Sequence, residues 1–179
     1  MIFLLKKFSI VENFIYLCKM KQLTLFMLAL LCLSACKPEK RNTNIPDAPI
    51  YFRLSLSNYS TFANGMGSVL SCPTDLIGSD KAGTFGYSGT VLLINNFPDY
   101  SNEPFSAYDA CCTNPVCVDG KNKVSAEILA TCSHCGSMFD LSVGGLVRSG
   151  AAKYPLRRYR VDIYGFGNAR TLAVSRYEY

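Results

Sequence analysis

The chain has 179 residues, which leaves room for one ordinary domain once a targeting segment is set aside. Its formal net charge is +5, but four of the 18 basic and one of the 13 acidic residues lie in the first 35 residues, which leaves 14 and 12. No basic run interrupts this nearly neutral remainder. The charge pattern therefore gives no electrostatic basis for a nucleic-acid partner, and we expect none.

The first candidate element is a secretory signal over residues 20–35, MKQLTLFMLALLCLSA. Lys21 supplies a positive start, and the apolar run Leu23–Leu33 is too short for a comfortable membrane span. The signal ends in Leu33-Ser34-Ala35-Cys36, which resembles the lipobox of bacterial lipoproteins, where the cysteine is acylated and the signal is cut away. The alternative is an uncleaved anchor helix.

This motif predicts a lipid-anchored protein of the bacterial cell envelope, held in a membrane through Cys36 and exposed to the periplasm or the cell surface. Residues 1–35 would form the signal region. Within it, residues 1–19 fit no targeting scheme, so they either precede the true start of translation or form an extra membrane-associated helix. Residues 36–49 are polar and contain proline, which predicts a flexible tether, and residues 50–179 form the predicted domain.

The domain is predicted to be all-β and antiparallel, because period-2 patterns dominate it and its connections are rich in Gly, Asn, Ser and Pro. Ile50–Leu56 alternates apolar and polar residues, and Val91–Ile94 is a continuous apolar run typical of a buried strand. Further strands are predicted at residues 124–129, 158–163 and 171–174. Residues 59–83 have only weak helical or irregular character.

Six of the nine cysteines lie beyond both the signal region and the predicted lipidation site Cys36, at Cys72, Cys111, Cys112, Cys117, Cys132 and Cys135. Cys112-x4-Cys117 and Cys132-x2-Cys135 would supply four thiolates from two loops, and a tetrahedral thiolate site suits zinc or iron. In an oxidising compartment the six cysteines could instead form three disulfides. Cys72 and Cys111 stand outside the set of four, so either is a candidate for a disulfide, and Cys72 is alternatively a buried thiol.

The run Cys132–Val161, CSHCGSMFDLSVGGLVRSGAAKYPLRRYRV, is similar to the second half of a Rieske domain. In that family Cys-x-Cys-His-Gly-Ser precedes an aromatic residue, Asp, a Gly turn and Pro-Leu. Tyr108–Cys117, YDACCTNPVC, resembles the family's Cys-Thr-His-x-x-Cys loop. The resemblance covers residues 85–175 and implies a Rieske-like antiparallel β-sandwich with a small two-loop cluster-binding subdomain. It also implies a 2Fe–2S centre, in which two Cys bind one iron and two His the other.

The chain departs from this ligand set, because it contains a single histidine. By resemblance, Cys112 and Cys132 match the two ligand cysteines. Asn114 and Cys135 stand at the positions of the two ligand histidines. The resemblance therefore supplies a scaffold for the site, but this chain cannot reproduce the family's cysteine–histidine ligands.

The second departure concerns the cysteine that matches Cys117, which in the family forms a disulfide with the cysteine at the place of His134. We interpret His134 as a polar loop residue rather than a ligand, and Asn114 as a turn residue before Pro115. Ser137 matches a serine that hydrogen-bonds a cluster sulfur in the family, and this residue is expected beside the site.

Three outcomes remain open for the two loops. In the first, Cys117 or Cys111 completes a four-thiolate set that holds a 2Fe–2S cluster of lower potential than a Rieske centre. In the second, the same four thiolates hold zinc. In the third, no metal binds and disulfides join the loops. The first outcome predicts an electron-transfer component with an unidentified redox protein partner, and the other two predict a non-redox structural or binding module. Catalysis by this chain alone is not expected, because one histidine cannot build the mononuclear iron site of a Rieske oxygenase.

Overall fold

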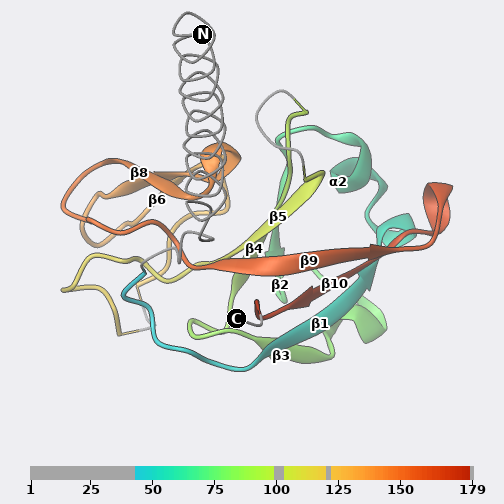
Figure 1. Cartoon of the computed structure of the whole chain (residues 1–179), viewed down its shortest axis with the longest axis horizontal. Helices are drawn as coiled ribbons and strands as arrows, with labels where there is room; N and C mark the ends of the chain where they lie inside the picture. The colour runs from blue at the N-terminus through green and yellow to red at the C-terminus, as the bar shows by residue number, and fades with distance from the viewer. Residues whose placement is uncertain (1–42, 99–102, 120–121, 178–179) are drawn as a thin grey trace, which may run out of the picture. The chain divides into compact units, whose positions relative to one another are not determined.

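The computed structural model describes residues 43–98, 103–119 and 122–177, all of which belong to one compact unit, Arg41–Tyr179 (Figure 1). The predicted signal region 1–35 and the predicted lipidation site Cys36 lie outside the described residues. Within the described part of the chain, no helix is both long enough and apolar enough to cross a membrane. The predictions for the N-terminal region therefore stay predictions.

A seven-stranded antiparallel sheet forms the body of this unit, with its strands in the order β2-β4-β5-β9-β10-β1-β3. The strands are β1 (Ile50–Ser55), β2 (Val69–Cys72), β3 (Gly83–Phe85), β4 (Val91–Asn95), β5 (Phe105–Asp109), β9 (Arg158–Tyr164) and β10 (Thr171–Ser175). One short helix, α2 (Ser60–Asn64), and the 3-10 turns η1 (Leu56–Asn58), η2 (Gly78–Lys81) and η4 (Gly167–Ala169) connect them. The predicted all-β class is confirmed.

The main core shows that this sheet curls on itself. Phe52 and Leu54 of β1 share one buried cluster with Val91 and Leu93 of β4, although four positions separate these strands in the sheet order. Burying these side chains removes their apolar surface from water, which is the dominant favourable term in folding. The residue between the two in β1, Arg53, faces solvent, so the predicted alternation is the pattern of a sheet with one wet face.

A second, three-stranded sheet packs on the other face of β4 and β5. It consists of β6 (Leu129–Thr131), β7 (Met138–Asp140) and β8 (Leu146–Ser149), with the 3-10 turn η3 (Leu141–Val143) after β7. Leu92 and Ile94 of β4 and Tyr108 of β5 join Phe139 and Leu141 in a second buried cluster. Because β4 is covered on both faces, its sequence is a continuous apolar run.

Two predictions about the chain's course need correction. The predicted strand 124–129 is absent: Val124 makes an isolated bridge to Cys132, and β6 begins only at Leu129. Between them the chain forms a tight loop, closed because Ser125 N donates to Thr131 O and Thr131 N donates to Ser125 Oγ, each at 2.9 Å. The alternation that suggested a strand does not continue through this loop, because Ala126 and Glu127 are both exposed.

The end of the predicted tether is packed against the domain. Ile45 is buried, its carbonyl accepts a bond from Arg157 Nη1 (2.9 Å), and Asp47 forms an ion pair with Arg157. Asn44 Nδ2 donates to Thr113 O at 2.8 Å. Residues 44–49 are therefore part of the folded unit, because these contacts fix the backbone that the polar composition suggested would be free.

Asp140, in the three-stranded sheet, should make the stability of the protein depend on pH. Its Oδ1 accepts a hydrogen bond from Ser142 N at 3.0 Å, and its Oδ2 lies 2.7 Å from Arg148 Nη2. Burial acts to raise the pKa of this carboxyl, but the bonds with Ser142 and Arg148 outweigh burial and hold the pKa below its ordinary value of 3.8. Since the folded pKa is below the unfolded one, the stabilisation is present above about pH 4 and is lost as pH falls through the folded pKa.

We therefore expect Arg148→Gln to destabilise the protein near neutral pH and to make no difference in strong acid. The effect stays below about 1 kcal/mol, because the Arg148 side chain is more than half exposed. Urea unfolding of both proteins from neutral to strongly acidic pH measures the difference. A difference that stays constant with pH would show that the Arg148–Asp140 pair is not its source.

Candidate metal centre

The first cysteine loop is shaped by a proline turn. It leaves the end of β5 at Asp109, and Cys117 N donates to Asn114 O at 2.7 Å, which closes a four-residue turn with Pro115 at its second position. Proline fixes the φ value which that position of a β-turn requires. The turn reverses the chain, so Cys117 comes back toward Cys112.

The second loop is closed by backbone bonds around a glycine. Gly136 N donates to Cys132 O at 2.8 Å, and Cys132 N donates to Ser137 O at 2.9 Å. Gly136 has a φ of +68°, in the left-handed region that favours glycine. This tight turn places Cys132 and Cys135 on the same side of the loop.

The segment 122–124 holds the two loops side by side. Cys112 N donates to Asn122 O at 3.0 Å, Lys123 bridges Cys111, and Val124 bridges Cys132. The strand predicted between the loops was 124–129, but the loops are joined instead by isolated bridges at Lys123 and Val124. It thereby pairs with both loops across a short stretch of chain.

The four cysteines predicted as ligands lie together. The sulfur atoms of Cys112, Cys117, Cys132 and Cys135 are all within 4.8 Å of one another, and Cys112 Sγ lies 3.6 Å from Cys135 Sγ. Cys112, Cys117 and Cys132 are buried in the second hydrophobic cluster, and Cys135 is partly buried against it. Four close thiol groups of this kind can hold a metal ion.

The apolar setting makes two of these thiols reluctant to ionise by themselves. Burial raises the pKa of the Cys117 thiol to about 12, with the neighbouring Cys135 as the next cause. Burial likewise raises the pKa of Cys112 far above its ordinary value. A cation at the centre of the cluster would offset this cost, because metal binding stabilises the deprotonated form of each ligand.

Cys135 behaves differently, because polar groups surround its sulfur. Burial acts to raise its pKa, but hydrogen bonding with Ser137 and Asn114 outweighs burial and lowers the pKa to about 6. Ser137 Oγ lies 3.2 Å from Cys135 Sγ and accepts a bond from Ala152 N at 3.1 Å, which fixes its position. The polar surroundings therefore favour the thiolate form of Cys135, which favours the approach of a cation.

The remaining predicted site residues take distinct places. His134 is exposed and stands outside the set of four, but its Nδ1 lies 3.3 Å from Cys117 Sγ. Asn114 is buried. It is the first residue of the proline turn, and its side chain also neighbours the Cys135 sulfur. Both lie at the rim of the cluster, where hydrogen bonds to sulfur adjust ligand charge.

Neither of the two candidate disulfide cysteines forms a disulfide in the described part of the chain. Cys72 is a buried free thiol at the end of β2, inside the main core, where burial and then Asp75 raise its pKa. Cys111 is buried, and its Sγ contacts Cys112 O at 3.6 Å. Of the two alternatives for the fourth ligand, the structure brings Cys117 into the cluster and leaves Cys111 outside.

Asp109 supports the site and was missed by the sequence interpretation. Its buried carboxylate accepts bonds from Cys111 N (2.8 Å), Tyr87 N (2.8 Å) and the Tyr159 hydroxyl (2.7 Å). Burial, and then the charge of Asp109, raise the pKa of Tyr159 above its ordinary range, so this phenol stays a donor. An acidic residue two positions before a cysteine pair was the available signal.

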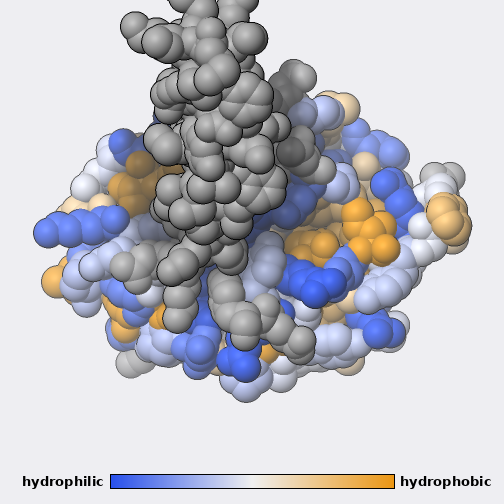
Figure 2. Space-filling view, viewed as in Figure 1, coloured by the Kyte–Doolittle hydropathy of each residue, from blue (hydrophilic) through white to orange (hydrophobic). Residues whose placement is uncertain are grey.

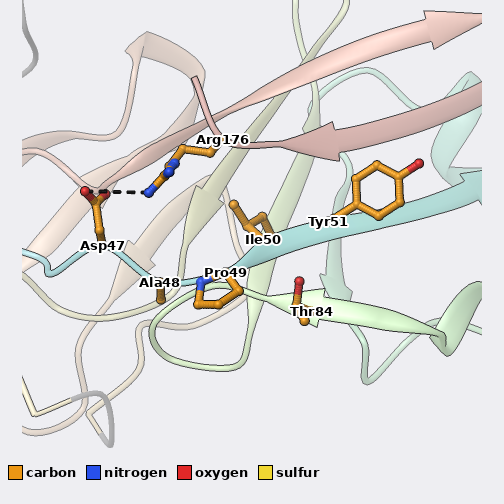
Figure 3. Close-up of a pocket in the computed structure, with 7 residues that line it drawn as sticks. All are labelled: Asp47, Ala48, Pro49, Ile50, Tyr51, Thr84 and Arg176. Atoms are coloured by element: carbon orange, nitrogen blue, oxygen red, sulfur yellow. Dashed lines mark ion pairs between the residues drawn. The ribbon is translucent and has the colours of Figure 1, made fainter. Parts of the chain in front are cut away.

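A separate pocket lies away from the cysteines (Figure 3), between the start of β1, β3 and the residue after β10. Its lining residues are Asp47, Ala48, Pro49, Ile50, Tyr51, Thr84 and Arg176. Arg176 Nη1 lies 3.8 Å from Asp47 Oδ2, so the pocket's two opposite charges partly offset each other. None of the four clustered cysteines contributes to it.

Fold and site together define an all-β protein with a buried four-cysteine candidate metal centre between two loops. Comparison of the chain with protein-family models, with curated proteins and with solved structures finds no match. The Rieske resemblance therefore depends on the motif alone.

Proposed function

We propose that Cys112, Cys117, Cys132 and Cys135 bind a single zinc ion and that this chain is a non-catalytic, non-redox β module whose two loops the ion ties together. The spacing of the four sulfur atoms supports this proposal most strongly. A tetrahedral ion with metal–sulfur bonds of about 2.3 Å places its sulfurs about 3.8 Å apart. The cluster has one sulfur pair at 3.6 Å and none beyond 4.8 Å, which fits one shared ion.

A 2Fe–2S cluster for electron transfer is the second candidate, and the Rieske-like order of Gly136-Ser137, Phe139-Asp140 and Pro155-Leu156 favours it. Its thiolates would bind as two pairs at opposite ends of the cluster, so sulfurs of different pairs would lie farther apart than the edge of one tetrahedron. The compact arrangement of the four sulfurs favours a single ion over this cluster.

Zinc is the ion we propose for two chemical reasons. The affinity of a given site generally increases from Fe²⁺ to Zn²⁺ in the divalent series, and four thiolates in a closed tetrahedron are a common structural zinc set. All four positions are taken by protein, so there is no open position at which water or substrate could be activated. This closed ligand set supports a structural role rather than a catalytic one.

The setting that we propose for this module is the bacterial cell envelope, with the chain attached to a membrane through acylated Cys36. The support is the order of positive start, apolar run and lipobox in residues 20–36. An exported protein meets oxidising conditions, in which unprotected thiols form disulfides. A bound ion would keep the four clustered cysteines as thiolates in that setting.

Cobalt substitution tests the proposed site. The full chain is prepared under reducing conditions, freed of metal with a chelator and titrated with Co²⁺, which absorbs visible light strongly in a tetrahedral thiolate site. We expect intense thiolate-to-cobalt absorption that saturates at one Co²⁺ per chain and disappears when Zn²⁺ is added, because zinc binds more tightly to thiolates. The absence of thiolate-to-cobalt absorption in the reduced protein would contradict the proposal.

A further inference from the structure

The outer face of β1, β10 and β9 carries a stacked arginine that the metal centre does not use. The Arg53 guanidinium carbon lies 5.5 Å from the centre of the Tyr51 ring and 6.0 Å from the centre of the Tyr164 ring. Both rings are about half exposed, at 50% and 54%. Two aromatic neighbours hold the guanidinium in place by cation–π attraction, so its planar donor group is preorganised at the surface.

The charges around Arg53 leave this cation uncompensated. No acidic side chain of the described residues forms an ion pair with Arg53. Asp162 of β9 lies opposite Arg53 with one strand, β10, between them, and it forms its ion pair with Arg160, at 2.9 Å. A second cation, Arg170, belongs to the hairpin between β9 and β10, where its Nε donates to Gly167 O at 3.0 Å. An immobilised guanidinium with unused donors is a group that recognises phosphate.

An apolar side chain projects from the hairpin that follows Tyr164. Phe166 is 94% exposed at the turn between β9 and β10, flanked by Gly165 (φ +83°) and Gly167 (φ +57°). A Cβ at Gly165 would meet Ala169 O at 2.6 Å, so only glycine permits this tight turn. Figure 1 places the hairpin at the right-hand end of the sheet, and Figure 2 shows hydrophobic colour there.

We propose that this face docks on a phospholipid bilayer, with Arg53 against lipid phosphates and Phe166 inserted at the boundary between headgroups and acyl chains. The charged part and the aromatic part of this surface both fit a bilayer. The arginines complement anionic headgroups, and exposed aromatic side chains, with Phe166 at the tip of a hairpin, suit the membrane interface. This docking is independent of the cysteine cluster, because none of the four clustered cysteines belongs to the face.

The absence of tryptophan from the chain makes a direct test possible. In the full chain, Phe166→Trp introduces a single indole at the tip, and Leu146→Trp introduces one at a 51% exposed position of β8 as the matched control. Any lipid at the N-terminus brings both variants to a vesicle equally. The fluorescence of each indole then reports whether its own position enters the membrane.

With vesicles that contain phosphatidylglycerol, we expect Phe166→Trp emission to shift to shorter wavelength and to be quenched by brominated lipid, whereas Leu146→Trp emission stays unchanged. Adding Arg53→Gln to Phe166→Trp should reduce the docking constant of the tip about fivefold, the effect of one surface cation near anionic lipid. An unchanged Phe166→Trp spectrum, or an equal shift in Leu146→Trp, would overturn the proposal.

Discussion

The Cys112→Ser variant should bind its metal more than about a hundredfold more weakly than the unaltered chain. Loss of a residue that only hydrogen-bonds a metal ligand already weakens metal binding by up to about that factor, and loss of the ligand itself should weaken it further. The serine hydroxyl is a hard, weakly acidic donor in place of a thiolate, and it would sit in a fully buried position. Competition with a chromophoric chelator measures the affinity. The unfolding midpoint of the variant should also no longer respond to a chelator, since its ion contributes nothing to folding.

Two further variants make this test specific. Cys111 is the adjacent cysteine, it is equally buried, and it stands outside the cluster, so Cys111→Ser should keep its metal. His134→Ala should keep one ion per chain as well, because the histidine is exposed and lies beside Cys117 rather than among the four sulfurs. If His134→Ala lost the ion while Cys135→Ser retained it, the ligand set would be His134 with three cysteines.

A second large effect is expected from Asp109→Ala, which should lower the free energy of unfolding by about 4 kcal/mol or more. The substitution removes one acceptor and leaves the backbone N–H groups of Tyr87, Ser88 and Cys111 and the Tyr159 hydroxyl without their partner in a buried site. Each such group costs about 1–3 kcal/mol. Since whole domains are stable by only about 5–15 kcal/mol, much of the fold's stability depends on this residue.

Tyr159→Phe is the matched control for Asp109. It removes a single hydrogen bond to the carboxylate and leaves the three backbone bonds, so we expect a loss of about 1.5–3 kcal/mol. Urea unfolding of both variants gives the comparison. Equal stability of the two variants would contradict the role of Asp109 as the shared acceptor, and a larger loss in Asp109→Ala supports it.

The strands predicted from the sequence are those in which the order of apolar and polar residues directly reflects which faces of the strand are buried. β1 alternates because one face meets the core and the other meets water, and β4 is uniformly apolar because both faces are covered. β5 was not predicted, since its sequence FSAYD is polar at Ser106 and Asp109, although all five of its residues are buried. Those polar groups are satisfied by Asn96, Arg158 and Tyr159, which are distant in sequence.

The four-cysteine set was predicted from spacing, but the choice between Cys111 and Cys117 as the fourth ligand was left open. The structure distinguishes them through the backbone: the turn at Asn114-Pro115 brings Cys117 back to the cluster, whereas Cys111 pairs with Lys123. The docked end of the predicted tether was missed for a similar reason. Ile45 is buried in a segment held by Arg157, which lies 112 residues away in the sequence and donates to the Ile45 carbonyl.

The most direct test of the single-ion site is elemental and spectroscopic analysis of the purified full chain. We predict one zinc ion per chain, no iron, and no visible absorption before or after reduction, because a d¹⁰ ion bound by thiolates is colourless and redox-silent. Two iron and two sulfide ions per chain, with visible absorption that changes on reduction, would contradict the account and favour the electron-transfer alternative. So would a metal-free protein in which Cys112, Cys117, Cys132 and Cys135 are paired in disulfides.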